Sequence, residues 1–344
     1  MNQKRNMIIW TGGLILLLLI SIFASVSIGS VSVALPTTTK ILIHHIPFIN
    51  STPTWEASEE LIVMNLRLPR VFLAILIGAM LSVSGVAFQG VLRNPLADPY
   101  ILGVSSGAAL GAAIAILFIP NLMLFGRFTL PIFAFLGSVL ALILVLLISG
   151  KQRHRGSDSF ILAGVIVQSF MGAVLSFLIT ISDKKLQSIV FWMMGSLANH
   201  DWQDVWVLIP YFMIGTLFLL IQQRDLNILS LGENAAIHLG MDVQKKKVLI
   251  LAFASLLAAS AISIVGIIGF IGLIIPHLIR IVFGSNHKIL LPVSVIAGGI
   301  FLLWTDTLAR TIIPSREIPI GVLTAFLGAP FFAYLFYKSR NGRS

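Results

Sequence analysis

Few residues in this chain could carry out covalent chemistry. Residues 103–107 match the Gly-x-Ser-x-Gly pattern, which in hydrolases places a nucleophilic serine on a sharp turn between a strand and a helix. Here the pattern lies at the start of a predicted apolar helix, and the strand–turn–helix context is missing. The remaining enzymatic alternative is an intramembrane serine protease, with His277 as the base. The chain has no cysteine, no His-Glu-x-x-His motif and no phosphate-binding Gly-x-x-x-x-Gly-Lys-Ser/Thr loop. The sequence therefore predicts no catalytic residue, no metal site and no cofactor in this chain.

Arginines are the stronger candidates for binding. Arg67 and Arg70 directly precede one apolar segment, and Arg310 and Arg316 follow another. One hypothesis is that they face lipid headgroups. The other is a ring of cations that docks an acidic partner, because arginine–carboxylate pairs fix register and orientation. Asp306 lies four residues before Arg310 and could pair with it on the same helix face.

Glycines indicate how the surrounding helices pack. Gly103, Gly107 and Gly111 are four residues apart, on one face of a predicted helix. A stripe of this kind lets two membrane helices approach backbone to backbone. A polar turn with two prolines, residues 93–99, precedes the stripe. The stretch therefore predicts two close-packed helices joined by a turn, with the glycines in a packing role.

The elements that position these residues are membrane spans. The chain has 344 residues, of which 57% are hydrophobic and 10% charged, whereas soluble domains carry about 25% charged residues. Segments of about 20 apolar residues are long enough to cross a bilayer. The predicted spans are residues 8–30, 71–91, 101–119, 128–149, 160–181, 205–221, 248–264, 267–283, 289–305 and 318–337. We therefore expect an all-α polytopic membrane protein with about ten transmembrane helices, in a single domain over residues 1–344.

The distribution of charge predicts the orientation of this bundle. With ten spans and the amino terminus inside, most of the 23 basic residues fall on cytoplasmic loops, as the positive-inside rule requires. The net charge of +10 is then a consequence of topology and does not indicate a nucleic-acid partner. Both termini are expected in the cytoplasm. The spans are nearly free of ionisable residues, which argues against a proton- or sodium-coupled transporter.

Three segments need separate interpretation. Residues 248–283 are too long for one span and contain Gly266, Gly269 and Gly272, so they predict two crossings with a break. Residues 186–204 favour a re-entrant or interfacial helix, or else a surface loop. Residues 224–247 form the longest cytoplasmic loop.

That loop contains the pattern of a short helix. Ser230 and Glu233 have the spacing of a capping box, and Gly240 can end a helix. Its apolar residues predict either a docking site for a soluble partner or a helix packed on its own bundle.

Six motifs in one order resemble a known family. They are RLPR (67–70), GVAFQGVLRNPLADPYILGVSSGA (85–108), FWMMGSL (191–197), LGENAAIHLGM (231–241), GIIGFIGLIIPHLIR (266–280) and PSREIPIGVLTAFLGAPFF (314–332). Together they look like the permease subunits of type II ABC importers for iron–siderophores, haem and vitamin B12, the FecCD-type family.

The resemblance implies a set of partners. Such permeases form a homodimer, or a heterodimer with a related permease, in the lipid of the cytoplasmic membrane. Two ABC ATPase subunits, which bind ATP and Mg, would dock on the 224–247 loop. An extracytoplasmic substrate-binding protein would dock through its acidic residues on Arg67, Arg70 and Arg310. The matching coupling residues are Leu231, Gly232, Glu233, Ala236, Leu239, Gly240 and Met241.

The resemblance also implies a gate and a substrate. The cytoplasmic gate would match Ser157 and Asp158, although an aspartate departs from the small hydroxyl residues expected there. The implied function is translocation of an iron–siderophore complex, the more populous branch, with vitamin B12 or haem as the alternatives. The chain itself would not be an enzyme.

Overall fold

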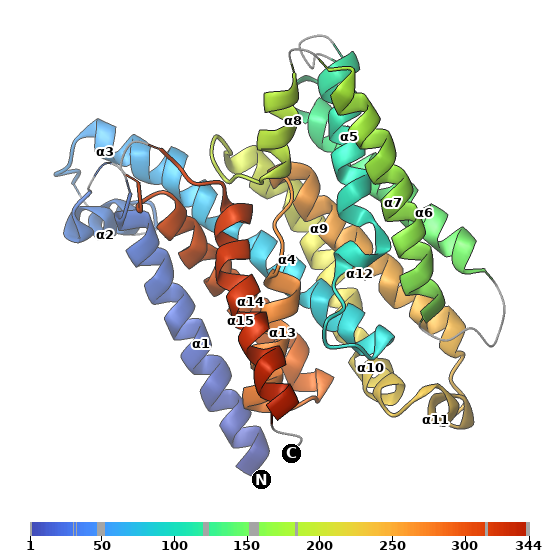
Figure 1. The fold of residues 1–344 in the computed structure, drawn as a ribbon. Coiled ribbons are helices and arrows are strands. Elements are labelled where there is room, and N and C mark those ends of the chain that lie inside the picture. The colour runs from blue at the N-terminus through green and yellow to red at the C-terminus, as the bar shows by residue number, and fades with distance from the viewer. Residues whose placement is uncertain are drawn as a thin grey trace.

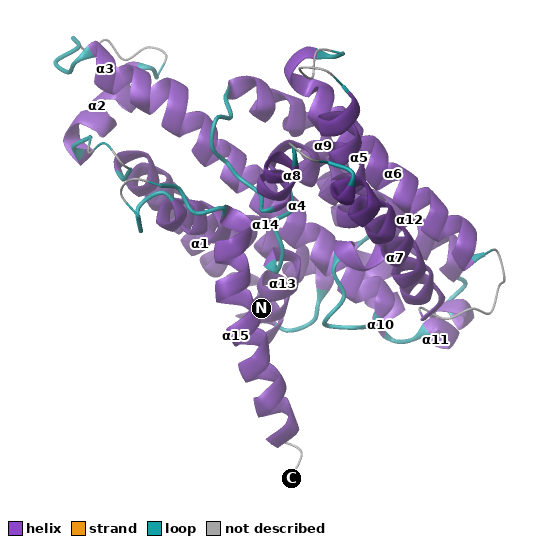
Figure 2. Ribbon diagram, turned by 45° about the horizontal axis from the view of Figure 1, so that its top comes forward, coloured by secondary structure: helices purple, strands orange, loops and turns teal. Residues whose placement is uncertain are grey.

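The fold is a bundle of helices (Figures 1 and 2). The computed structural model describes residues 2–29, 31, 33–46, 52–119, 124–150, 158–182, 185–313 and 316–341, and these residues contain no strand. The α-helices are α1 (Asn2–Ser27), α2 (Leu35–His44), α3 (Ala57–Leu61), α4 (Leu68–Leu92), α5 (Val104–Phe118), α6 (Thr129–Ser149), α7 (Asp158–Thr180), α8 (Leu186–Met193), α9 (Trp202–Ile221), α10 (Gln223–Ser230), α11 (Glu233–His238), α12 (Val243–Val265), α13 (Ile271–Phe283), α14 (His287–Ala309) and α15 (Ile320–Asn341). A π-helical turn, Ile62–Arg67, joins α3 to α4.

The predicted spans correspond to helices. Within the described residues, seven helical segments are long and apolar enough to cross a membrane. Three shorter apolar helices, Val104–Phe118, Ile271–Phe283 and Ile320–Tyr334, occupy the positions of the remaining predicted spans. The all-helical membrane fold is therefore confirmed, and the count reaches ten only when the shorter helices are included.

Helix α4 lies at the centre of the bundle and packs against α12, α13 and α14 (Figure 1). Almost every side chain from Leu68 to Leu92 is buried. Glycines permit the close crossings: a Cβ on Gly78 would lie 2.2 Å from the carbonyl oxygen of Gly298. A Cβ on Gly85 would lie 1.9 Å from that of Gly272. Because these neighbours are backbone atoms, neither position has room for a side chain.

A polar contact accompanies the crossing of α4 and α13. In a regular helix the carbonyl of Gly272 would accept a hydrogen bond from residue 276, but Pro276 has no N–H. The buried Gln89 of α4 supplies the missing donor, with its Nε2 3.0 Å from the Gly272 oxygen. Its Oε1 accepts from Arg280 Nη2 at 3.0 Å. One glutamine thus bonds both the Gly272 carbonyl and Arg280 of α13 to the central helix.

Helices α5 and α6 pack through the glycine stripe. A Cβ on Gly107 would lie 2.3 Å from the carbonyl oxygen of Gly137, and one on Gly111 would lie 2.0 Å from that of Phe133. Gly103 differs from the expectation of a third helical glycine. It precedes α5 as the N-cap residue, with φ +74°, and so allows the chain to enter the helix.

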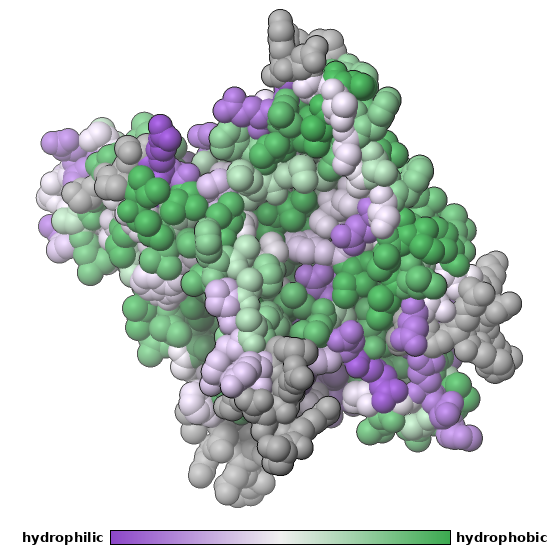
Figure 3. Space-filling view, in the orientation of Figure 1, coloured by the Kyte–Doolittle hydropathy of each residue, from purple (hydrophilic) through white to green (hydrophobic). Residues whose placement is uncertain are grey.

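The outer surface of the bundle is apolar. Leucines and phenylalanines of α6 and α7 are exposed, among them Leu140, Leu147, Leu162 and Phe170. Figure 3 shows hydrophobic residues over this face. In water such a surface would be unfavourable, whereas lipid solvates it, as the composition predicts.

The two ends of the bundle differ (Figure 1). Helices α2, α3 and α8 lie at one end. Helices α10 and α11 lie at the other, together with the start of α1 and the end of α15. The arginine-bearing start of α4 and the end of α14 therefore lie opposite the 224–247 loop.

The 248–283 segment is broken in two, as predicted. Helix α12 ends at Val265, and the chain turns through Gly266 and Phe270, both with positive φ, before α13 begins. The hydroxyl of Tyr100 donates to the Ile268 carbonyl within the break. The segment 186–204 contains one short helix, α8, followed by a loop to α9.

Three helix ends meet at this break through their backbones. The N–H of Ser196 donates to the Val265 oxygen at 2.8 Å. The N–H groups of Ile320 and Gly321 donate to the oxygens of Gly195 and Met194, both at 3.1 Å. The ends of α8 and α12 and the start of α15 are thus joined without any side chain.

Helix α1 lies beside α14 (Figure 1) and is held by polar contacts. Trp304 Nε1 donates to Ser21 Oγ at 2.9 Å. The hydroxyls of Ser25 and Thr307 are 2.7 Å apart. Much of the rest of α1 is exposed.

Candidate docking and coupling sites

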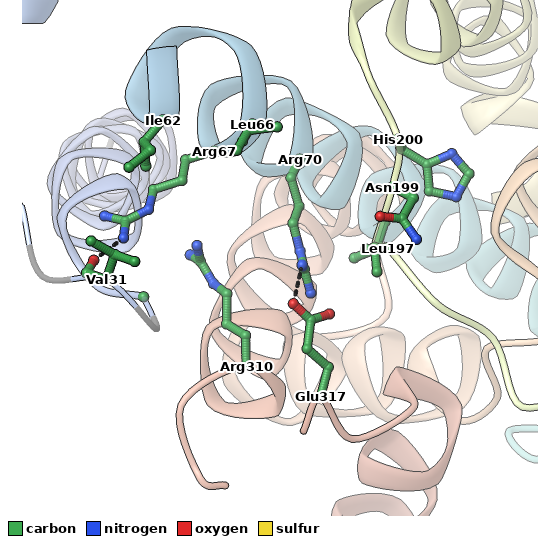
Figure 4. Close-up of a pocket in the computed structure, with 12 residues that line it drawn as sticks. Val31, Ile62, Leu66, Arg67, Arg70, Leu197, Asn199, His200, Arg310 and Glu317 are labelled. Atoms are coloured by element: carbon green, nitrogen blue, oxygen red, sulfur yellow. Dashed lines mark hydrogen bonds and ion pairs between the residues drawn. The ribbon is translucent and has the colours of Figure 1, made fainter. Parts of the chain in front are cut away.

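Three arginines meet at one cavity. The cavity has a volume of about 260 Å³ and lies where α4, α14 and the α8–α9 loop converge (Figure 4). The lining residues are Gly29, Val31, Ile62, Leu66, Arg67, Arg70, Leu197, Ala198, Asn199, His200, Arg310 and Glu317. We call it the arginine cavity. Three of the four arginines singled out from the sequence are therefore neighbours, although they come from opposite halves of the chain, whereas Arg316 does not line the cavity.

Arg70 is held by two carboxylates. Its Nε and Nη2 donate to Asp306 at 2.8–3.0 Å, and its Nη1 donates to Glu317 at 2.9 Å. The pair of Asp306 with Arg310 that their spacing predicts is present, with Arg310 Nε 3.7 Å from Asp306 Oδ2, but the carboxylate of Asp306 accepts its hydrogen bonds from Arg70. Arg70 is therefore the principal partner of Asp306.

Arg67 and Arg310 bind the carboxyl end of α1. Arg67 Nη1 donates to the carbonyls of Val26 and Ser27 at 2.8 and 2.9 Å. Arg310 Nη2 donates to the carbonyl and the hydroxyl of Ser25, at 2.6 and 2.7 Å. The last carbonyls of a helix lack intrahelical donors and carry partial negative charge, which these two cations compensate. Both arginines are buried, so Arg70 and Glu317 present the more accessible charges.

Burial also changes the acidity of Arg310, which follows the last residue of α14. Desolvation lowers its pKa to about 10, while Asp306 raises it and Arg70 opposes Asp306. The group remains cationic at neutral pH because this pKa is still well above 7. The arginines and their partners therefore comprise three guanidinium groups and two carboxylates, Asp306 and Glu317, of which Glu317 lines the cavity.

The 224–247 loop folds into two short helices. Helix α10 runs to Ser230, whose hydroxyl donates to the Asn227 carbonyl, so the predicted capping box with Glu233 is wrong. Gly232 precedes α11 instead, and Gly240, with φ +80°, follows it. The sequence pattern located the second helix but not α10, because α10 continues almost directly from α9.

The predicted coupling residues fall into two groups. Leu231 and Leu239 are exposed, whereas Ala236 is completely buried. Glu233 pairs with the buried Lys247 of α12, which fixes α11 against the bundle. Ile237, which was not among the predicted residues, is also exposed. The apolar surface of this loop therefore consists of Leu231, Ile237 and Leu239, with Gly232, Gly240 and Met241 at the turns around α11.

The predicted gate is described only in part. Ser157 lies outside the described residues, and Asp158 is the exposed first residue of α7. Along α7, Gln168 and Ser169 face a cavity of about 520 Å³ together with Ser105 and Ser106 of α5. These polar residues lie on an open surface of an otherwise apolar bundle.

The serines of the Gly-x-Ser-x-Gly pattern show no catalytic arrangement. The Ser106 hydroxyl donates to the Gly103 carbonyl, and no hydrogen bond among the described residues joins Ser105 or Ser106 to a histidine. No group of three metal-ligating side chains is present in the described part of the chain. The protease interpretation is not supported.

These features define a class of protein. A bundle of apolar helices with a cationic cavity at one end, exposed short helices at the other and no nucleotide-binding motif is typical of the membrane-spanning subunit of a transporter powered by another chain. The chain belongs to the FecCD transport family, whose model matches residues 17–338.

Similar proteins support this assignment. An uncharacterized ABC transporter permease protein of Bacillus subtilis is 43% identical over 329 residues, which are 95% of this chain and 93% of that protein. The hemin transport system permease protein of Yersinia pestis is 37% identical and is matched over 100% of both chains. A solved metal-chelate type ABC transporter in an inward-facing conformation is 36% identical, with a TM-score of 0.81 over 95% of this chain and 98% of that one.

The chain is therefore a permease of a type II ABC importer and a multi-pass membrane protein. It is not itself an enzyme, since ATP is hydrolysed on a separate subunit.

Proposed function

We propose that this permease translocates an iron–siderophore complex. The observation that carries the proposal is the similarity, over nearly the whole chain, to a metal-chelate type transporter. The cavity between α5 and α7 supports it, because Ser105, Ser106, Gln168 and Ser169 offer hydroxyl and amide groups to a large polar solute. No cluster of ligands that would strip the metal lies among the described residues, which suits passage of an intact chelate.

Uptake measurements test the substrate. Cells that lack their own importers would express the permease with its ATPase and candidate binding proteins, and uptake of a ferric hydroxamate, hemin and cyanocobalamin would be compared. We expect ATP-dependent accumulation of the ferric hydroxamate. Accumulation of hemin or cyanocobalamin alone would overturn the iron–siderophore proposal while leaving the importer class intact.

The proposed ATPase contact is the apolar surface of the 224–247 loop. Two ATPase subunits would dock there, one on each permease of a dimer formed with a second copy or a related chain. Exposed leucines in a cytoplasmic loop are unfavourable unless a partner covers them. L239D should therefore reduce co-purification of the ATPase, whereas L124D, at an exposed leucine of the opposite end, should not. Equal retention of the ATPase by both variants would contradict this contact.

The proposed location is the cytoplasmic membrane, with both termini in the cytoplasm. The start of α1, the end of α15 and the 224–247 loop lie at the same end of the bundle, which supports this orientation (Figure 1). Because the natural chain has no cysteine, single cysteines can report sidedness. A membrane-impermeant maleimide should label E59C in intact cells, and K245C only after lysis.

The proposed binding-protein contact is the arginine cavity. An acidic group of the binding protein would reach Arg70, since Arg67 and Arg310 are committed to α1. R70K keeps a charge opposite Asp306 but cannot form the same fork, so it should weaken association of the binding protein without unfolding the permease.

A further inference from the structure

The two carboxylates on Arg70 differ in accessibility. The side chain of Asp306 is 1% exposed, and that of Glu317 is 44% exposed. Asp306 accepts three of the four hydrogen bonds that Arg70 donates to carboxylates, and Glu317 accepts one. Asp306 is thus the permanent partner, and Glu317 occupies the remaining Nη1 position at the rim of the cavity.

The contact with Glu317 is weak enough to exchange. Solvent competes for an exposed carboxylate, so pairs of this kind contribute little to stability. The backbone beside Glu317 is fixed, because the N–H of Ile318 donates to the Ala309 oxygen and that of Arg316 to the Ile313 oxygen. Rotation of the Glu317 side chain is therefore sufficient to release Arg70, and no helix has to move.

Release of Glu317 would change the charge of the site. Three guanidinium groups face two carboxylates, a net charge of +1, which becomes +2 once Glu317 turns away. Figure 4 shows Glu317 extended toward Arg70, with Arg310 directed into the same space. A carboxylate of another protein in the place of Glu317 would accept the same hydrogen bond from Arg70 Nη1.

We propose that Glu317 is an internal competitor for the acidic group of the docking partner. The proposal rests on the proposed function, in which Arg70 binds a carboxylate of the substrate-binding protein. In the undocked permease Glu317 satisfies Arg70, and on docking the carboxylate of the partner replaces it. Glu317 thereby lowers the affinity of the permease for its binding protein and favours release after delivery.

The test compares E317Q with E59Q. Both variants remove one glutamate charge, and glutamine at position 59 preserves the capping box that Glu59 forms with Glu56 at the start of α3. The permease–ATPase complex in nanodiscs would be titrated with the binding protein that supports uptake in the experiment above. We expect E317Q to bind about two- to fivefold more tightly, the range expected for loss of an exposed competing ion pair. E59Q should bind as the natural protein does.

R70K separates failure of this inference from failure of the docking site. If E317Q binds equally or more weakly while R70K binds more weakly, the docking site stands and Glu317 is not a competitor. If neither E317Q nor R70K changes the affinity, the arginine cavity is not the docking site and both ideas are overturned. Unchanged melting temperatures of both variants would exclude unfolding as the cause.

Discussion

Arg70 and Asp306 join α4 to α14 by a fork of three hydrogen bonds, in which Arg70 Nη2 lies 2.8 Å and Nε 3.0 Å from the carboxylate. The two residues are 236 positions apart in the chain, so this pair links the second predicted span to the ninth. Because Asp306 is buried, its negative charge is stable in the fold only while the positive charge of Arg70 compensates it.

Loss of Asp306 should therefore be severe. D306A leaves the guanidinium of Arg70 with only its exposed partner, and breaking a buried pair costs about 3–5 kcal/mol. E317Q, which removes the exposed partner, should cost less than about 1 kcal/mol. Melting in detergent, followed by the fluorescence of the six tryptophans, measures both effects. Similar melting temperatures for the two variants would contradict this division of roles.

Glycine at position 85 should tolerate no side chain. The methyl group of G85A would lie 1.9 Å from the Gly272 oxygen, so α4 and α13 must separate. Overpacking of this kind costs about 1–3 kcal/mol. G172A is the matched control, because a Cβ on Gly172 meets no atom within 4 Å. We expect a lower melting temperature and yield for G85A alone.

The effect of Gln89 should depend on Pro276. Q89L leaves the Gly272 carbonyl and Arg280 without their partner, a loss of about 1–3 kcal/mol. In a P276A background, residue 276 regains an N–H that can bond to the Gly272 carbonyl, so Q89L should cost less there. A double-mutant cycle on the melting temperature tests this coupling. Equal costs in both backgrounds would show that Gln89 does not compensate for the proline.

Asp98 should make stability depend on pH. Burial raises its pKa to about 6 from 3.8, while the hydrogen bond from the Tyr100 N–H opposes the shift. The charged carboxylate therefore lowers the stability of the folded protein. This loss of stability is fully present above about pH 6 and disappears as the pH falls toward 4.

D98N keeps the oxygen that accepts from Tyr100 N–H but carries no charge. It should be more stable than the natural protein at pH 7.5, by a difference of order 1 kcal/mol. The two melting temperatures should converge as the pH falls to about 4.5. A gap that is independent of pH would show that the carboxyl group is not the cause.

The sequence predicts the helices better than their contacts. Long apolar segments locate the spans, and the glycines of 248–283 locate the break, because both signals are local. The pair of Asp306 with Arg310, four residues away, was predicted and is present at 3.7 Å, but the closer partner of Asp306, Arg70 at 2.8 Å, was not predicted. A pairing between distant segments leaves no trace in local spacing.

In the candidate sites, too, the sequence identified residues but not their partners. Arg67, Arg70 and Arg310 were singled out from the sequence, but Arg67 and Arg310 bind backbone carbonyls of α1, which have no residue type to recognise. Glu317 lay within one of the family motifs, yet no local pattern relates it to Arg70. Likewise, the sequence does not indicate that Gln89 donates to the Gly272 carbonyl, because that bond depends on how α4 and α13 cross.

The attachment of α1 has a consequence for biogenesis. Its end can bond to Arg67 once residue 67 has been synthesised, but the contacts of Ser25 with Thr307 and Arg310 require residues more than 280 positions later. During translation, α1 therefore cannot pack against α14 until almost the whole chain has been inserted into the bilayer. The packing of α1 on α14 can therefore be the last step of assembly, and a truncated chain that lacks α14 would hold α1 only through the chain that follows it and the contacts with Arg67.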